Sequence, residues 1–166
     1  VGTLAVAGAA SASASAAYTA GEYLYFTWNT DYTLTLESAD ARLTRSATGA
    51  TSAQWGTIIG GTWSSIGTEI TGISSSVTPT TSTAPVTTTF TGVSDLTSGQ
   101  LALAVYGGSS TANSTWLRID GRPSGTPQVA LAINGTMNPV AVPEPATMSL
   151  LGLGALAMVL RRKIRK

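Results

Sequence analysis

The chain has 166 residues, of which 43% are hydrophobic and only 10% charged, and it contains no histidine and no cysteine. This composition excludes disulfide frameworks, zinc fingers, sites with imidazole ligands, cysteine nucleophiles and Ser-His-Asp triads. Five of the nine basic residues fall within the last six positions, so the part before residue 142 has four arginines against seven acidic residues, a net charge of −3. Phosphate backbones bind clustered lysine and arginine, so we do not expect nucleic acid as a partner.

Residues 1–16 have the features of a signal peptide. Val1–Ala10 is a run of small and apolar residues, and overlapping Ala-x-Ala patterns end at Ala12, Ala14 and Ala16. Small residues at this spacing are what a signal peptidase accepts, and ten apolar residues are too few to span a bilayer. We expect the true start of this signal to lie outside the sequence and the mature protein to begin after Ala14 or Ala16. The alternatives are a buried helix and an Ala/Ser-rich tail.

Residues 17–138 are expected to form a β-rich body, because the hydrophobic periodicity is mainly two and not 3.6, in short runs between turn residues. Asn29–Asp31 has the composition of a hairpin turn between two of these runs. The pattern predicts an all-β fold, a small antiparallel β-sandwich or jelly roll. The runs are Tyr23–Trp28, Tyr32–Glu37, Val86–Phe90, Leu101–Tyr106, Trp116–Asp120 and Val129–Ile133.

The hydrophobic side of these runs predicts the core, and two further segments are ambiguous. Gln54–Val77 has irregular apolar spacing with five glycines, which argues against a long helix. Ser74–Thr91 is rich in serine and threonine, as in an exposed loop or a region that accepts O-linked glycans. The residues that we expect in the core are Leu34, Leu36, Leu103, Val105, Leu117, Ile119, Leu131 and Ile133.

Tryptophans are the strongest candidates for binding in the body. Aromatic faces bind the apolar faces of sugar rings, so a sugar-stacking platform could form from these side chains: Trp28, Trp55, Trp63, Trp116, Tyr23, Tyr25 and Tyr106. The candidate glycan contacts among them are Trp55, Trp63 and Trp116; the alternative is that the tryptophans pack the core. Trp116 shares a strand face with Arg118 and Asp120. A pair of carboxylates is the only catalytic apparatus that the composition permits, and nothing marks two of them as neighbours. We therefore expect no enzyme, no cofactor and no metal site.

The C-terminal end combines three features in a fixed order. Residues 139–145 form a linker that ends in Pro143-Glu144-Pro145, and its prolines exclude a helix and leave the tripeptide extended. Residues 146–166 are expected to form a transmembrane helix with a basic tail. The apolar segment falls short of a hydrocarbon core of about 30 Å, a gap that long basic side chains reduce by reaching the interface. Arg161, Arg162 and Lys163 should remain cytoplasmic and so set the orientation.

This order and spacing resemble the PEP-CTERM sorting signal of exported proteins in Gram-negative bacteria. The resemblance rests on Pro143-Glu144-Pro145, on the apolar segment that ends at Leu160, and on Arg161-Arg162-Lys163. It implies processing near the tripeptide by exosortase, a membrane-embedded transpeptidase-type enzyme. It also implies transient insertion into the inner membrane, followed by delivery to the cell envelope surface or the extracellular matrix. The alternative is that the segment is a permanent anchor.

Two functions for the body remain open from the sequence. The first is a structural or adhesive surface protein associated with exopolysaccharide or biofilm, which the low charge and abundant threonine favour. The second is a carbohydrate-binding module that uses tryptophan and tyrosine on its surface. A cluster of such rings on the surface of the fold would favour the second.

Overall fold

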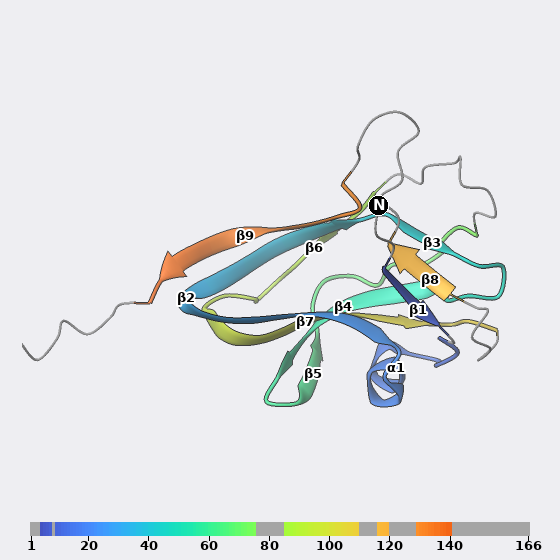
Figure 1. Cartoon of the computed structure of the whole chain (residues 1–166), viewed down its shortest axis with the longest axis horizontal. Coiled ribbons are helices and arrows are strands. Elements are labelled where there is room, and N and C mark those ends of the chain that lie inside the picture. The colour runs from blue at the N-terminus through green and yellow to red at the C-terminus, as the bar shows by residue number, and fades with distance from the viewer. Residues whose placement is uncertain (1–3, 8, 76–84, 110–115, 120–128, 141–166) are drawn as a thin grey trace, which may run out of the picture.

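The computed structural model describes residues 4–7, 9–75, 85–109, 116–119 and 129–140, and within these ranges the chain is mostly β-strand (Figure 1). Every pair of neighbouring strands is antiparallel, which confirms the predicted all-β class. The elements are β1 (Leu4–Ala7), α1 (Ala14–Ala20), β2 (Tyr23–Ala41), β3 (Leu43–Arg45), β4 (Ser52–Ile59), β5 (Thr62–Ser65), β6 (Val86–Thr89), β7 (Leu96–Tyr106), β8 (Trp116–Ile119) and β9 (Leu131–Pro139).

The larger sheet has the strand order β5-β4-β7-β2-β6, and β9 also pairs with β2. The first part of β2 pairs with β7, and its second part, from Tyr32 to Ala41, pairs with β9. Figure 1 shows β2 running out along β7, turning, and returning beside β9. The predicted hairpin at Asn29–Asp31 is therefore wrong, because the runs on either side of it form one bent strand and do not pair with each other.

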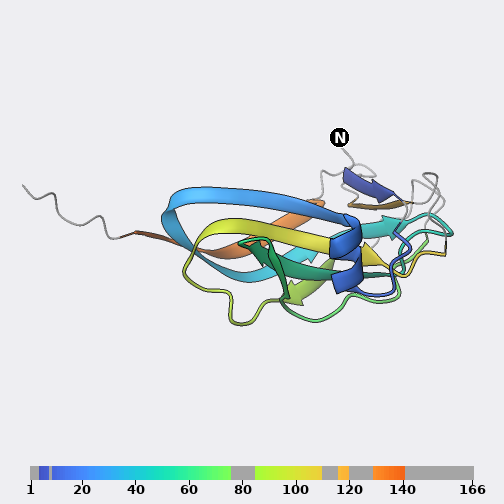
Figure 2. The same cartoon turned by 90° about the horizontal axis from the view of Figure 1, so that it is seen from below.

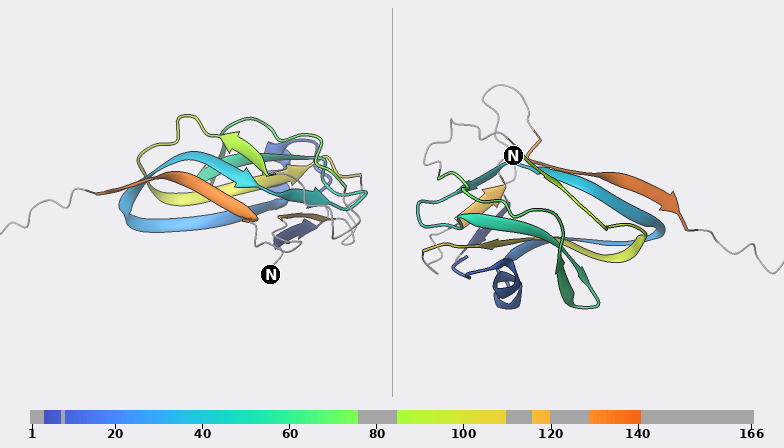
Figure 3. Two further views of the ribbon diagram at one scale, coloured as in Figure 1. Left: turned by 90° about the horizontal axis from the view of Figure 1, so that it is seen from above. Right: turned by 180° about the vertical axis from the view of Figure 1, so that it is seen from behind.

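The bend places the two parts of β2 in two layers, which Figure 3 shows from above and from behind. These layers belong to one continuous sheet. The sandwich or jelly roll therefore stays a prediction. A second sheet of three strands, in the order β1-β8-β3, lies at the end of the molecule opposite the bend of β2.

Both sheets contribute to one hydrophobic core. Leu103 and Val105 from β7 and Leu117 from β8 are fully buried, and Ile119 is almost so, which confirms four of the predicted core residues. Leu34, Leu36 and Leu131 are half-buried. The prediction for Ile133 is wrong, because its side chain is 38% exposed. Within the described part of the chain β9 pairs with β2 alone, so its side chains have strand neighbours on one side only.

The ambiguous segment Gln54–Val77 contains most of a tight hairpin formed by β4 and β5. The two strands pair from Gly56 with Ser65 to Ile59 with Thr62. The two residues between them, Gly60 and Gly61, both have positive φ, at 58° and 78°. Two consecutive left-handed residues are what a type I′ turn needs, and glycine adopts them without steric cost.

The N-terminal residues belong to the body in this structure. The strand β1 pairs with β8, and the helix α1 lies against the outer side of β7 and β5 (Figure 2). Ala9, Ala14 and Ala17 are buried. The expected signal peptide of residues 1–16 therefore overlaps folded elements, and its predicted boundary at Ala16 lies inside α1.

The predicted transmembrane helix over residues 146–166 lies outside the described residues, as does the tripeptide at 143–145. Among the residues that the structure does describe, no helix is long and apolar enough to cross a membrane.

Candidate functional site

The strand β7 presents two different faces. Leu101, Leu103 and Val105 point into the main core, whereas the alternating residues Ala104 and Tyr106 belong to a second, smaller cluster on the other side of the sheet. Alternation follows from the pleat of a strand, which sends successive side chains to opposite faces. The helix α1 covers part of this outer face.

Four aromatic side chains form a row on this outer face. In order they are Trp63 on β5, Tyr18 on α1, and Tyr23 and Tyr25 on β2. The ring centroids of Trp63 and Tyr18 are 5.8 Å apart with an interplanar angle of 23°, a stacked pair. Tyr18 and Tyr23 are 5.5 Å apart at 42°, and Tyr23 and Tyr25 are 5.9 Å apart at 51°. We call these four residues the aromatic row.

Small residues beneath the row allow the rings to lie close to the sheet. A Cβ added to Gly56 would lie 2.5 Å from Cζ2 and 2.6 Å from Cζ3 of Trp63, so the indole occupies the space that a side chain would take. Ala104 packs against Tyr23 and Trp63. The hydroxyl of Tyr18 donates to the carbonyl oxygen of Gly61 at 2.6 Å and so ties α1 to the turn between β4 and β5.

The aromatic row is exposed at its Tyr25 end and half-buried along the rest of its length. Tyr25 is 55% exposed, whereas Tyr18, Tyr23 and Trp63 are half-buried. These three rings help to hold α1 on the sheet, and each still presents part of its surface to solvent. Because an aromatic ring with a hydroxyl or an indole N–H joins an apolar face to a polar edge, the row suits a ligand that is itself amphipathic.

The structure separates the three tryptophans that the sequence singled out. Trp63 lies in the aromatic row. Trp55 is fully buried in the main core, with its ring edge-on to Phe90 at 6.1 Å and 68°, so the expectation that Trp55 contacts a glycan is wrong. Trp116 begins β8, and its side chain lies outside what the structure describes.

Tyr18 is the site residue that sequence analysis missed. It falls two residues beyond the predicted end of the signal peptide, and the sequence offered a helix in this region only as an alternative to that signal. The sequence does hold a local signal for this helix. Ser13 caps it by accepting a hydrogen bond from the Ala16 N–H at 3.3 Å, and Gly21 ends it with φ of 77°. Serine before a helix and glycine after it are its common boundary residues.

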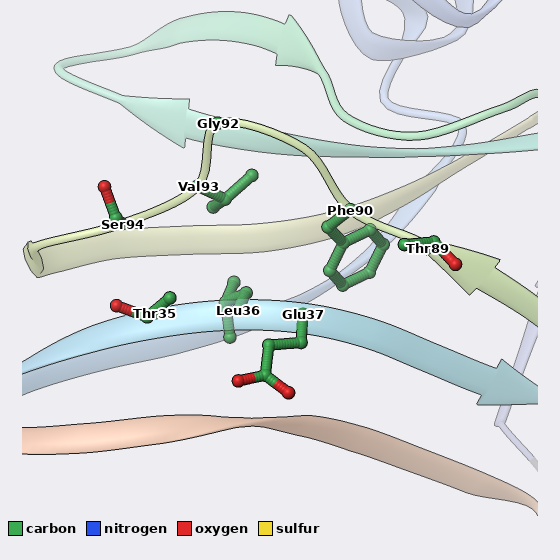
Figure 4. Close-up of a pocket in the computed structure, with 8 residues that line it drawn as sticks. All are labelled: Thr35, Leu36, Glu37, Thr89, Phe90, Gly92, Val93 and Ser94. Atoms are coloured by element: carbon green, nitrogen blue, oxygen red, sulfur yellow. The ribbon is translucent and has the colours of Figure 1, made fainter.

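An open groove of about 410 Å³ lies beside β2 and the segment that follows β6 (Figure 4). Figure 4 shows the carboxylate of Glu37 pointing away from the apolar side chains of Phe90 and Val93. The groove therefore offers no pair of convergent polar groups. Its lining residues are Thr35, Leu36, Glu37, Thr89, Phe90, Gly92, Val93 and Ser94.

No group of three or more acidic side chains that would hold a metal ion occurs in the described ranges. Burial raises the pKa of the Tyr106 phenol above its ordinary value, and a hydrogen bond with Glu69 and the negative charge of Glu69 raise it further. The phenol of Tyr106 therefore stays neutral to a higher pH than a free tyrosine, which suits its place beneath α1.

Comparison with known proteins identifies the C-terminal signal. The family model described as the PEP-CTERM protein-sorting motif matches residues 141–163. This range contains Pro143-Glu144-Pro145 and ends at Lys163, so the resemblance drawn from these residues is confirmed. No curated protein and no solved structure matches the chain.

Proposed function

Because the chain carries the PEP-CTERM protein-sorting motif, it is an exported protein sorted through exosortase, and we propose that its body binds polysaccharide at the cell surface or in the extracellular matrix. In this proposal the protein is a structural or adhesive component and not an enzyme. The observation that carries the binding function is the aromatic row, with three ring contacts between 5.5 and 5.9 Å and an exposed end at Tyr25.

The chemistry of the row favours a sugar over other partners. Sugar rings present C–H groups on their faces and hydroxyls at their edges, and aromatic side chains with polar tips match both. The body has no lysine and a net charge of −3. Anionic polymers would meet repulsion from this charge, so a neutral polysaccharide is the ligand class that the body favours.

The competing explanation is that the row is a satellite core that only fixes α1. It accounts for Tyr18, Tyr23 and Trp63, which are half-buried against the helix and the sheet. It does not account for Tyr25, which is 55% exposed and adds little to helix packing. Tyr25 therefore distinguishes the two explanations.

Affinity electrophoresis of the full chain in gels that contain neutral soluble polysaccharides, such as glucans and mannans, tests the proposal. Replacement of Tyr25 by alanine removes one stacking ring, a contact on the scale of about 0.5–1.5 kcal/mol, which corresponds to about two- to tenfold in affinity. Tyr32→Ala is the matched control, because Tyr32 is 43% exposed on the same strand and lies outside the row. Equal retardation of both variants and the wild type would contradict the proposal.

The residues of the sorting signal have separate proposed roles. Glu144→Ala should leave the protein inserted in the membrane but unprocessed. Replacement of Arg161, Arg162 and Lys163 should disturb insertion itself, because basic residues hold the cytoplasmic side. Mass spectrometry of the surface fraction provides the test. Peptides from Met148 to Leu160 in that fraction would mean that the segment stays attached as a permanent anchor.

A further inference from the structure

The segment from Ala9 to Gly21 is held by contacts that a discarded signal peptide would not make. We infer that this segment is retained in the exported protein, and that the Ala-x-Ala patterns ending at Ala12, Ala14 and Ala16 are not its processing site. The inference takes from the proposed function only that the protein is exported. Glu22 is the residue that fastens the segment to the body.

The first contacts join the segment to the end of β7. The N–H of Gly107 donates to the carbonyl oxygen of Ser11 at 2.8 Å, and the N–H of Gly108 donates to that of Ala9 at 2.8 Å. Ala9 itself is buried in the main core. A Cβ at position 108 would lie 2.5 Å from the Ala9 oxygen, so the close approach of the two backbones requires glycine there.

Glu22 holds the same segment from the other side. One carboxylate oxygen accepts a hydrogen bond from the N–H of Ala10 at 3.2 Å, and the other accepts one from the N–H of Ser11 at 3.1 Å. The backbone of Glu22 is fixed as well, since its N–H donates to the carbonyl oxygen of Ala17 and its carbonyl oxygen accepts from the N–H of Val105. Bonds to a charged acceptor are about twice as strong as neutral ones.

The helix α1 depends on residues that cleavage at the predicted bonds would remove. Ala14 and Ala17 are buried against Ala104 and Tyr106. A cut after Ala14 or Ala16 would remove the Ser13 cap and part of a helix of only seven residues. So short a remnant cannot maintain helical structure, and the outer face of β7 would lose its cover.

Retention also has a consequence for binding. Tyr18 joins Trp63 to Tyr23 in the aromatic row, with centroid distances of 5.8 and 5.5 Å. Because α1 holds this ring in place, the retained segment completes the row. Glu22 is in this sense a positioning residue, since it acts through the segment that carries Tyr18.

The direct test is Edman sequencing and intact-mass measurement of the full chain after export. We expect the N-terminal residue at Ala9 or upstream of it. An N-terminus at Ala10 or any later residue would overturn the inference. Neither measurement involves a glycan, so loss of polysaccharide binding with an N-terminus upstream of Ala10 would reject the proposed function and leave this inference intact.

Hydrogen exchange tests the fastening residue independently of processing. In the wild type, peptides that cover residues 9–17 should be protected, and Glu22→Gln should lower that protection because the amide retains only one acceptor oxygen. Glu37→Gln, at an exposed carboxylate on β2, is the control and should leave the protection unchanged. Exchange of residues 9–17 at the rate of an unfolded peptide in the wild type would overturn the inference, as would unchanged protection in Glu22→Gln.

Discussion

The variant Trp55→Ala tests whether Trp55 belongs to the core or to a ligand-binding surface. The side chain is fully buried in β4. A tryptophan buries about 150–250 Å², which at about 25 cal/mol per Å² stabilises the fold by about 4–6 kcal/mol. Truncations of buried aromatic residues to alanine cost about 3–5 kcal/mol, in agreement with this value. The total stability of a domain is about 5–15 kcal/mol, so the variant should lose a large part of it.

Trp55→Phe should destabilise the fold much less than Trp55→Ala, because the loss of buried area is partly offset by the removal of an unpaired polar group. A phenyl ring can keep the edge-on contact with Phe90. The indole Nε1 of Trp55 is buried and has no hydrogen-bond partner among the described groups. Its removal should recover part of the desolvation penalty, about 1–3 kcal/mol for a buried unpaired group, against the area lost with the smaller ring.

Thermal and urea denaturation followed by circular dichroism measure these changes. At about 4 °C for each kcal/mol in a domain of this size, Trp55→Ala should lower Tm by about 12–20 °C. Trp63→Ala, at a half-buried ring, should lower it by less than half as much. Wild-type stability in Trp55→Ala together with weaker polysaccharide binding would refute the placement of Trp55 in the core.

Substitutions on the outer face and in the core test the packing. Gly56→Ala places a Cβ within 2.6 Å of Trp63 ring atoms, so it should shift the Trp63 fluorescence and reduce polysaccharide affinity as far as Trp63→Ala does. Leu103 is 0% exposed and Ile133 is 38% exposed. Leu103→Ala should therefore destabilise the body by about 2–5 kcal/mol, and Ile133→Ala by about 0.5 kcal/mol. Similar losses of unfolding free energy in urea for the two variants would contradict this placement. Burial raises the pKa of Tyr106 above its ordinary value of 10.0, so the unfolded chain loses the proton first and stability falls as pH rises above about 10. Tyr106→Phe should flatten this alkaline loss, as Tm measured against pH would reveal.

Local periodicity was sufficient to predict which side chains of the core strands β7 and β8 are buried. The run around Leu103 alternates large apolar residues with alanine, and the run around Leu117 alternates aliphatic residues with charged ones from Leu117 onward; both leucines are fully buried. Alternation identifies which side of a strand is apolar, but it does not say whether another layer covers that side. Ile133 follows the same pattern on β9 and is exposed, because the only strand with which β9 pairs in the described residues is β2.

The sequence identified three of the four members of the candidate site. Trp63, Tyr23 and Tyr25 were among the aromatic residues expected to form a sugar-stacking platform, and all three lie in the aromatic row. Trp55 lies eight residues before Trp63, on the neighbouring strand β4, yet it faces the opposite side of the sheet. The spacing of these two tryptophans in the sequence does not predict this, because the turn at Gly60 and Gly61 lies between them and sets the pairing of the strands. Tyr18 was missed because the sequence around it is also compatible with a cleaved signal peptide.

The sequence by itself determined the sorting signal and the all-β class. The sorting signal is linear: an enzyme and a membrane recognise a tripeptide, an apolar segment and a basic cluster in order, and no long-range contact is needed to form them. The β class follows from a period of two, which is likewise local. Only the tertiary structure decided that Ala9–Gly21 is part of the body, because its stability comes from Glu22, Gly107 and Gly108. The aromatic row was decided in the same way, since its rings come from three elements that meet only when the sheet has formed and α1 has packed on its outer face.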